Sequence, residues 1–456
     1  MDSRFRAAVE QARKSGDLYF AGLLSKERIT TSLRESRAWF QGWVYSGAVT
    51  VWVFLSQCLS ADHSCREAVA GLIAWRVKNG QSACSADTSA YCTARDQLPE
   101  KTCRDLALGV GRESHQQAPE SWLWKTRRVI LGDGSTFTMA DTEANQKEYP
   151  QQSGQKAGCG FPIMRALVLF SLAVGSVIEA AISPYSGKQT GENSLLRTLH
   201  STLQEGDVLV LDRYFSVWFD IALLQQQGVD VVVRKHQLRA TDFRSGQRLG
   251  KDDHLVCWSK PQKPTWMDSE TYHSLPDSLR LREIRVRVTQ PGFRTRTLVV
   301  VTTLLEADDY THDDLATVFR LRWHAELNLR SLKIVMQMDH LRCKEPHRVR
   351  NEFYMHLLAY NLIRQVMAEA AQKFDVSPHE ISFKGTMQTL NQFLPMLSDA
   401  VSLDHWYDSL LEAIATHIVA NRPDRIEPRC RKRRPKKFKN LREHRSVYKN
   451  RFRSKG

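Results

Sequence analysis

Hydrophobic residues recur at helical spacing in the first part of the chain. The residues that follow this spacing include Trp39, Trp43, Val49, Trp52, Phe54 and Leu55. A further helix opens at Ser64 and runs to about Trp75. Because apolar residues three and four positions apart indicate amphipathic helices, we predict a helical N-terminal domain over residues 1–120. Short helices around Thr88–Arg95 and Glu100–Leu108 form either a helix-turn-helix-like unit or a hairpin that only packs.

The pattern changes at about residue 121 to apolar runs that alternate with amphipathic helices. The runs read as strands are Arg128–Thr136, Ala166–Leu172, Val174–Ile182, Asp207–Phe215 and Val229–Val233, and the helices are Gly191–Leu203 and Ser216–Gln227. This order is typical of a mixed α/β sheet covered by helices. The apolar stretch Ala166–Ile182 is too short and too charged for a membrane span, so two buried strands explain it better.

Short polar segments with prolines and tryptophans follow, and then helices return. Ile284 and Val286 alternate with Arg285 and Arg287, which predicts a half-exposed strand, and Thr297–Leu304 reads as a buried strand that returns to the sheet. The predicted segments are helical 1–120, α/β 121–235, a β-rich insertion 236–296, α/β again 297–372, C-terminal helices 373–421 and a basic tail 422–456.

The positive charge of the chain is concentrated in this tail. The whole sequence has 65 basic and 50 acidic residues, a net charge of +15. Residues 422–456 hold 16 basic and three acidic residues, a net of +13, so the other 421 residues carry only about +2. The run Arg429–Lys437 lacks apolar periodicity, and we expect it to stay disordered until it meets a polyanion. One interpretation is that this run binds nucleic-acid phosphates, and the alternative is that it only solubilises the protein.

The cysteines and the first residues of the chain indicate the cellular compartment of the protein. Nine cysteines without a C-x-x-C pair indicate reduced thiols in the cytoplasm. Residues 1–6 lack the apolar segment of a secretory signal, so we expect a cytoplasmic protein with no membrane partner. A zinc site is an alternative for one group of residues, but their spacing fits no common zinc module. These residues are Cys58, His63, Cys65, Cys84, Cys92 and Cys103.

The segment 319–333 concentrates the candidate chemistry. It contains no Pro or Gly and is rich in helix-forming residues, so we predict one continuous helix. Phe319, Arg322, Glu326 and Lys333 are three, four and seven positions apart, which places them on one face, in a row about 21 Å long. A carboxylate flanked by cations suits a site that holds a metal and a polyanion together. The alternative is a solvated, salt-bridged surface.

Two predicted strands carry a further acid each, Asp133 and Asp212. A carboxylate on an apolar run is at least half-buried and needs a partner or a metal. Two strand acids and Glu326 are a suitable ligand set for Mg²⁺, which prefers carboxylate oxygens. The alternatives are that Asp133-Gly134 forms a hairpin turn and that Asp212 caps the following helix.

These residues resemble a known family. Phe319, Arg322, Glu326 and Lys333 look like the Y-R-E-K signature of DDE transposases in insertion-sequence family four. The runs 133–136 (Asp-Gly-Ser-Thr) and 211–215 (Leu-Asp-Arg-Tyr-Phe) are similar to its first and second catalytic-acid motifs. All three occur in the family's order, and the resemblance covers about residues 120 to 370 directly. One departure is that Phe319 stands where the family usually has Tyr, so it has no hydroxyl to bond a phosphate.

The resemblance implies an RNase H-like catalytic fold over 121–235 and 297–372, and cut-and-paste DNA transposition. Asp133, Asp212 and Glu326 would be the catalytic acids and would hold two Mg²⁺ ions, for which Mn²⁺ substitutes. The implied partners are double-stranded DNA, as terminal inverted repeats and as target, and a second copy of the chain in the end complex. The protein would then be nucleoid-associated, and residues 1–120 would contact the ends.

The resemblance also implies DNA-binding residues. Arg322 would grip a phosphate bidentately, Lys333 would act as a point charge, and Phe319 would pack near the DNA. In the family, the β-rich insertion helps to hold a DNA hairpin, and an aromatic residue receives a flipped base. Trp258 and Trp266 are the candidates here, and a place in the core of the insertion is the alternative for each.

Two other functions stay open at this point. One is an RNase H-like nuclease that only cleaves, which differs in not joining a cut end to a second DNA molecule. The other is a non-catalytic DNA-binding protein derived from a transposase, against which the complete acidic triad argues.

Overall fold

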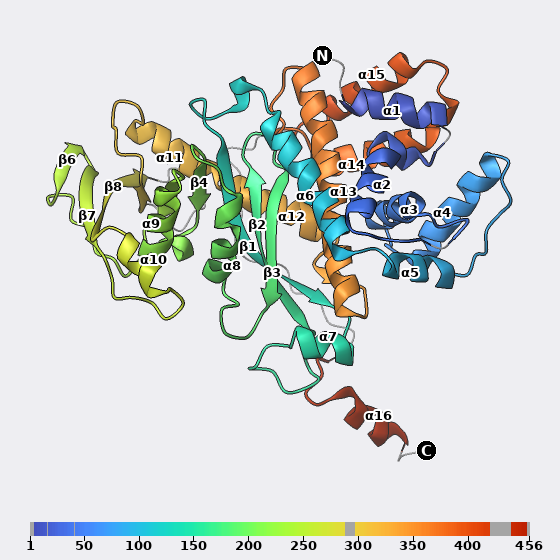
Figure 1. Cartoon of the computed structure of the whole chain (residues 1–456), viewed down its shortest axis with the longest axis horizontal. Helices are drawn as coiled ribbons and strands as arrows, with labels where there is room; N and C mark the ends of the chain where they lie inside the picture. Colours follow the sequence, from blue (N-terminus) through green and yellow to red (C-terminus); the bar gives the residue numbers. More distant parts are fainter. Residues whose placement is uncertain (1–3, 16, 41, 288–296, 420–438, 454–456) are drawn as a thin grey trace.

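The computed structural model describes residues 4–15, 17–40, 42–287, 297–419 and 439–453. Helices from both ends of the chain gather on one side of a central sheet, and a β-rich extension lies on the other side (Figure 1). No helix within these ranges is long and apolar enough to cross a membrane. The apolar stretch Ala166–Ile182 instead forms most of two paired strands, as predicted.

The N-terminal part is helical, as predicted. Its elements are α1 (Arg4–Ser15), η1 (Tyr19–Gly22), α2 (Lys26–Glu35), α3 (Gly47–Leu59), α4 (Cys65–Lys78), α5 (Ser89–Asp96), α6 (Glu100–Gln116) and η2 (Glu120–Trp122). The prediction was wrong for Trp39 and Trp43, which lie between α2 and α3 and are 78% and 105% exposed. Gly42 disfavours a helix there, and Ser46 accepts the N-cap hydrogen bond that starts α3.

The sheet has the order β3-β2-β1-β4-β5-β9-β8-β7-β6, with β10 paired to β1. The strands are β1 (Val129–Met139), β2 (Ile163–Ser171), β3 (Val177–Pro184), β4 (Val208–Leu211), β5 (Asp230–Arg234), β6 (Gln247–Gly250), β7 (Asp253–Ser259), β8 (Ser278–Arg287), β9 (Thr297–Thr302) and β10 (His340–Leu341). β1, β4 and β5 are parallel, whereas β2 runs antiparallel to β1. The predicted mixed α/β fold class is confirmed, and the order β3-β2-β1-β4-β5 agrees with the RNase H-like core that the resemblance implies.

The remaining helical elements include those that cover both faces of this sheet (Figure 1). They are α7 (Glu143–Glu148), α8 (Glu192–Leu199), η3 (His200–Thr202), η4 (Arg213–Phe215), α9 (Trp218–Gln226), α10 (Ser269–Ser274), α11 (His312–Leu321), α12 (Trp323–Arg330), the π-turn η5 (Ser331–Val335), α13 (Pro346–Lys373), α14 (Phe383–Phe393), η6 (Leu394–Asp399), α15 (Leu403–Thr416) and α16 (Arg445–Arg453). Alternate strand residues point to opposite faces, so the two faces build separate hydrophobic clusters. Leu131 and Val210 join the cluster of α6 and α13, while Ile130 and Leu209 join that of α8 and α9.

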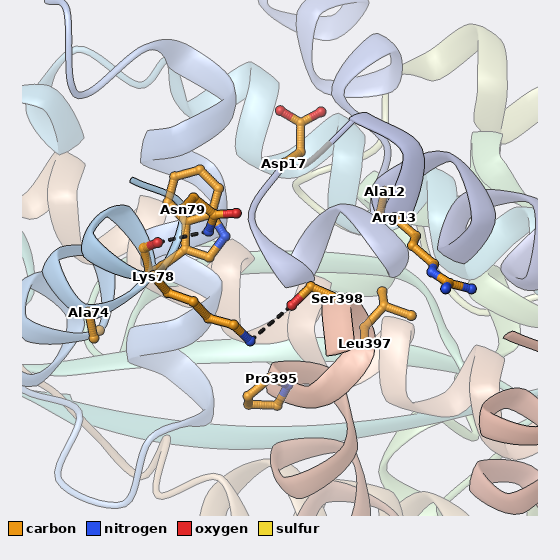
Figure 2. Close-up of a pocket in the computed structure, with 11 residues that line it drawn as sticks. Ala12, Arg13, Asp17, Ala74, Lys78, Asn79, Pro395, Leu397 and Ser398 are labelled. Carbon is orange, nitrogen blue, oxygen red and sulfur yellow. Dashed lines mark hydrogen bonds between the residues drawn. The ribbon is translucent and has the colours of Figure 1, made fainter. Parts of the chain in front are cut away.

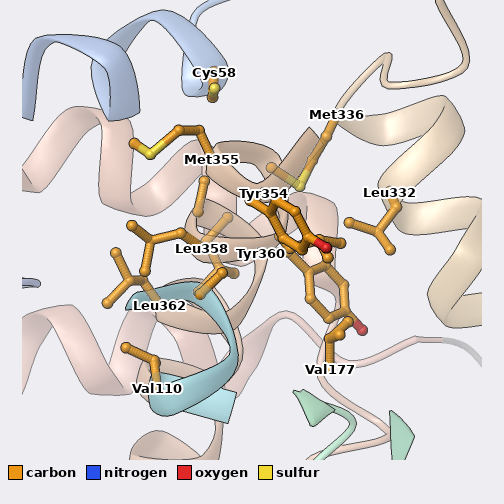
Figure 3. Packing of buried hydrophobic residues seen from close by; sticks show 14 of the residues in the cluster. Cys58, Val110, Val177, Leu332, Met336, Tyr354, Met355, Leu358, Tyr360 and Leu362 are labelled. Carbon is orange, nitrogen blue, oxygen red and sulfur yellow. The ribbon is translucent and has the colours of Figure 1, made fainter. Parts of the chain in front are cut away.

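Helix α13 is the centre of the larger cluster. It is buried along most of its length, as expected for a helix that is packed on several sides. Figure 3 shows Tyr354, Leu358 and Tyr360 of α13 among side chains of other elements, including Val110 of α6 and Val177 of β3. Since α6 belongs to this core, the packing alternative fits the pair α5 and α6 better than an exposed DNA-binding unit does.

The extension β6–β8 continues the sheet beyond β9 and is built around buried ion pairs. Lys235 donates to both carboxylate oxygens of Glu283 at 2.6 Å, and Arg282 binds Asp253 through two hydrogen bonds. β8 and β9 occupy the two stretches predicted as strands. Breaking one partner of such a buried pair costs roughly 3–5 kcal/mol, so these pairs hold the extension in a defined register.

The basic tail lies only partly within the described residues. The run Arg429–Lys437, for which disorder was predicted, lies outside them. Within the described part of the tail, Arg445–Arg453 forms the helix α16, which the sequence patterns did not indicate.

Candidate active site

Asp133 and Asp212 lie side by side on neighbouring parallel strands. In the register of β1 and β4, Leu131 pairs with Val210. Asp133 comes two residues after Leu131, and Asp212 comes two residues after Val210. The two carboxylates therefore point to the same face at the same level of the sheet. The hairpin alternative for Asp133-Gly134 is wrong, because both residues lie inside β1. Asp212 holds the N-cap position of η4, but its side chain makes no capping hydrogen bond.

The third acid comes from a helix that differs from the prediction. The expected continuous helix over 319–333 is divided into the end of α11, the helix α12 and the π-turn η5. Arg322 is the junction of α11 and α12, and its Nη2 donates to Glu326 Oε1 at 2.6 Å. The prediction of one straight helical face is thus wrong. Two of the four residues predicted to share it, Arg322 and Glu326, are nevertheless in direct contact.

The electrostatic environment of Asp133 includes the other two acids. The pKa of Asp133 is raised to about 6, first by burial and also by the nearby carboxylates of Glu326 and Asp212, while Arg322 opposes the shift. Asp133 on β1 therefore lies in the field of Asp212, which follows β4, and of Glu326 on α12. A buried group of carboxylates disfavours its own ionised form unless a cation compensates it.

This donor set fits a hard divalent cation. All three ligands offer carboxylate oxygen, which Mg²⁺ and Mn²⁺ prefer. In the orientation that the structure describes, no three His, Cys, Asp or Glu side chains of residues 4–15, 17–40, 42–287, 297–419 and 439–453 converge on one metal position. Glu326 is instead paired with the Arg322 guanidinium. The described N-terminal cysteines and His63 form no such group either.

Lys333 lies against the strand that carries Asp133. The wider π-turn η5 brings its Nζ onto β1, where it donates to Ser135 Oγ at 3.1 Å and to the Thr136 carbonyl at 2.9 Å. Burial lowers the pKa of Lys333. The ammonium is therefore fixed two to three residues beyond Asp133, at one side of the acids.

The three aromatic candidates are placed differently. The Phe319 ring is buried, with 7% exposed, in the main hydrophobic cluster. Trp258 is also 7% exposed, and its Nε1 donates to Glu283 Oε1 at 3.1 Å. Trp266 is half-buried, with its ring 3.7 Å from the Arg197 guanidinium and packed edge-on to Phe219. The core alternative fits Trp258, and no contact within the described residues joins either tryptophan to the acids.

Arg234 is a residue of this face that the sequence patterns did not single out. In the register of β4 and β5, Leu211 pairs with Val233, so Arg234 comes level with Asp212 on the next strand. Asp133, Asp212 and Arg234 thus form a row across three parallel strands. The strand order β1-β4-β5 would have revealed the row, because the carboxyl ends of parallel strands meet at one edge of a sheet.

A well-formed pocket elsewhere does not belong to this site. Figure 2 shows the pocket, of about 280 Å³, between α1, α4 and η6, where Lys78 Nζ donates to Ser398 Oγ at 3.0 Å. Its lining contains no residue of β1, β4 or α12. The contact joins the two ends of the chain and is structural.

Comparisons with known proteins show what this chain is similar to. The family model described as "Transposase DDE domain" matches residues 124–362, which include all three acids. The chain is 23% identical over 359 residues to the transposase InsG of insertion sequence element IS4 from Escherichia coli K12, covering 77% of each chain. It is 36% identical over 69 residues to the putative transposase InsL of IS186A from the same organism, covering 15% of this chain and 19% of InsL. A cryo-EM structure of the piggyBac transposase synaptic complex with hairpin DNA aligns with a TM-score of 0.42 and 9% identity, covering 86% of this chain and 82% of that one.

Proposed function

This chain belongs to the DDE transposases of insertion-sequence family four, and on that premise we propose that Asp133, Asp212 and Glu326 catalyse cleavage and joining of the ends of an insertion sequence. The enzyme is an insertion-sequence transposase, which cleaves and transfers DNA strands. The observation that carries the assignment of residues is the level row of Asp133 and Asp212 on β1 and β4, with Glu326 in the same electrostatic field.

The proposed roles follow from these positions. Asp133 and Asp212 would hold two divalent ions from the sheet, and Glu326 would complete the set from α12. When bound, the ions supply charge that polarises the scissile phosphate and stabilises the attacking and leaving oxygens. Arg322, released from Glu326, would bind a phosphate oxygen through its planar guanidinium, and Lys333 would hold a neighbouring phosphate as a point charge.

Both proposed steps are phosphoryl transfers at this one site. In the first, water attacks the phosphorus at the end of the element and the bond to the 3′ oxygen breaks, which leaves a free 3′-hydroxyl. In the second, this hydroxyl attacks a phosphodiester of the opposite strand or of target DNA. Each step forms one P–O bond and breaks another, so neither needs an outside energy source. Since both ends must be held together, we further propose that two copies assemble on them, with residues 1–120 contacting the ends.

The experiment that tests this function uses the DNA that flanks the coding sequence. A plasmid that carries the flanking segments, with their inverted repeats, is incubated with the protein and Mg²⁺. We expect cuts at the outer borders of both repeats and none in a plasmid with scrambled repeats. Cleavage without regard to the repeats would contradict the proposed function.

Phe319 tests whether the ring at this position acts by packing. Because the ring is buried in the main cluster, we expect Phe319→Ala to slow end cleavage several-fold. Phe319→Tyr should stay within about threefold of the parent, a difference of ~0.65 kcal/mol at most. Cleavage and strand-transfer rates of both variants are measured on one pre-formed end complex. A large gain from Tyr, or no loss from Ala, would show that the packing account is wrong.

The basic tail should bind DNA without regard to sequence. Deleting residues 429–456 should weaken non-specific binding and flatten its salt dependence, each lost phosphate contact removing about 0.9 from the log–log slope. Binding to a random duplex is measured over a range of salt concentrations. A control that keeps the length but changes the basic residues of 429–437 to Gln separates charge from length. An unchanged slope in both variants would mean that the tail does not touch DNA.

A further inference from the structure

A cationic pocket lies beside the acids, at the end of β5. It has a volume of about 200 Å³, and its lining residues come from the ends of β4 and β5, the loop after β5, β8 and the start of β9. The charged side chains of the lining are those of Arg213, Arg234, Lys235, Arg239 and Arg285, together with His236. No Asp or Glu contributes to the lining.

Three of these cations have no acidic partner among the described residues. Lys235 and Arg285 are satisfied by Glu283 and Asp252, respectively. In contrast, no carboxylate of the described ranges lies within ion-pair distance of Arg213, Arg234 or Arg239. Arg213 instead donates to the Gln237 side chain at 2.9 Å, and Arg239 lies over the Trp258 ring, 4.1 Å from its centre. The pocket therefore holds three guanidiniums that form no ion pair with a carboxylate of the described residues.

The protonation of these guanidiniums shows the same imbalance. Burial lowers the pKa of Arg234, and the neighbouring Arg213 and Arg322 lower it further, with Asp212 opposing them. Burial also lowers the pKa of Arg239. Arginine stays charged in proteins, so a lowered pKa marks a site in which a bound anion would be stabilised.

The position of the pocket relates it to the catalytic centre. Arg234 is level with Asp212, on a strand that lies about 4.8 Å from β4. Lys333 is held on β1, two to three residues beyond Asp133. A DNA strand that crosses the sheet from β1 to β5 would thus meet Lys333 and the acids first, and then the pocket.

We propose that this pocket binds a phosphodiester of the DNA strand that continues past the catalytic centre on the β5 side, with Arg234, Arg213 and Arg239 as its ligands. The proposal rests on the proposed function, because it takes DNA at the acids as given. Two sources share this chemistry: the flanking DNA outside the element before cleavage, and target DNA after it. Planar guanidiniums suit either, since they bind phosphate oxygens through paired hydrogen bonds.

The test compares Arg234→Gln with Arg234→Lys, which keeps the charge, and with Arg248→Gln as a control on the exposed edge strand β6. Binding is measured over a range of salt concentrations on three duplexes: an end with its flanking DNA, a pre-cut end without it, and target DNA offered to the pre-cut complex. We expect Arg234→Gln to weaken one of the two continuing DNAs about tenfold and to lower its salt slope by about 0.9. Arg234→Lys should recover most of the loss, and the pre-cut end alone should bind as in the parent.

The outcomes distinguish flanking DNA from target DNA as the ligand of the pocket. They also distinguish a failure of the pocket proposal from a failure of the proposed function. A loss on the flanked end assigns the pocket to the flank, and a loss only in target capture assigns it to the target. Unchanged affinity and salt slope on all three DNAs would overturn the proposal, even if the parent cleaves normally. A parent that binds through the pocket but never cleaves would instead refute the proposed function. If Arg234→Gln does not fold, Arg213→Gln serves as the same test, because its side chain is exposed.

Discussion

Single replacement of Asp133, Asp212 or Glu326 with Ala should reduce Mg²⁺-dependent nicking of the element's end to below a few per cent of the parent rate. In the proposed function the three carboxylates hold the metal ions together, so each removal would take away a ligand that the other two cannot replace. Losses of a single preorganised electrostatic group typically reach about 10²–10³-fold in rate. The rates are measured on a supercoiled plasmid that carries one end, under conditions in which the parent nicks it completely.

Binding of the end separates a catalytic defect from a folding defect. We expect each Ala variant to bind the end nearly as well as the parent, because the DNA contacts come from other side chains. Asp242→Asn is a matched control, since this acid lies in the loop between β5 and β6 and, among the described residues, forms an ion pair only with the exposed Arg244. It should nick at the parent rate. A triad variant that keeps more than a few per cent of the activity would remove that residue from the catalytic set.

Gly111→Ala should destabilise the whole fold, by roughly 3–5 kcal/mol. Gly111 is where α6 crosses β3, and a Cβ at this position would lie 1.8 Å from the Val177 carbonyl oxygen and 2.6 Å from Asn361 Nδ2. Neither neighbour can yield easily. Asn361 accepts from the Val177 N–H at 2.7 Å and donates to the Val177 carbonyl at 2.8 Å, and all three residues are buried. The helix would have to move away from the sheet and lose these contacts.

The comparison for Gly111 is Gly71→Ala, in α4. A Cβ at Gly71 meets nothing within 4 Å, so this change should only improve helix propensity, by about 0.5–1 kcal/mol. Midpoints of urea denaturation of the parent and both variants provide the measurement. A Gly111→Ala variant with a midpoint at or above that of the parent would mean that α6 and β3 are not packed as described.

Local patterns predicted those parts of the molecule that depend on neighbouring residues in the chain. The apolar run Ala166–Ile182 predicted the two strands β2 and β3. The apolar run before Asp212 predicted β4 and placed this acid at its end. Trp39 and Trp43 were misassigned because their spacing alone resembles a helix, whereas the cap at Ser46 decides where α3 begins. The periodicity of apolar residues does not report such caps.

Features that depend on contacts between distant segments were not predictable in the same way. The division of the 319–333 segment comes from tertiary contacts, since Lys333 is bound to β1 and a uniform α-helix would not carry it there. Arg234 became a candidate only when the strand order placed it level with Asp212. Trp258 belongs to the core through its bond to Glu283, a partner 25 positions away.

The most direct test of the central claim is whether this protein joins a cut end to a second DNA molecule. A duplex that ends at the 3′-hydroxyl of the terminal repeat is incubated with the protein, Mg²⁺ and a supercoiled plasmid. The account predicts plasmid molecules covalently joined to the end through that hydroxyl, in the parent and not in Glu326→Ala. Cutting of the end or of the plasmid with no joined product would contradict it and would leave a nuclease in place of a transposase.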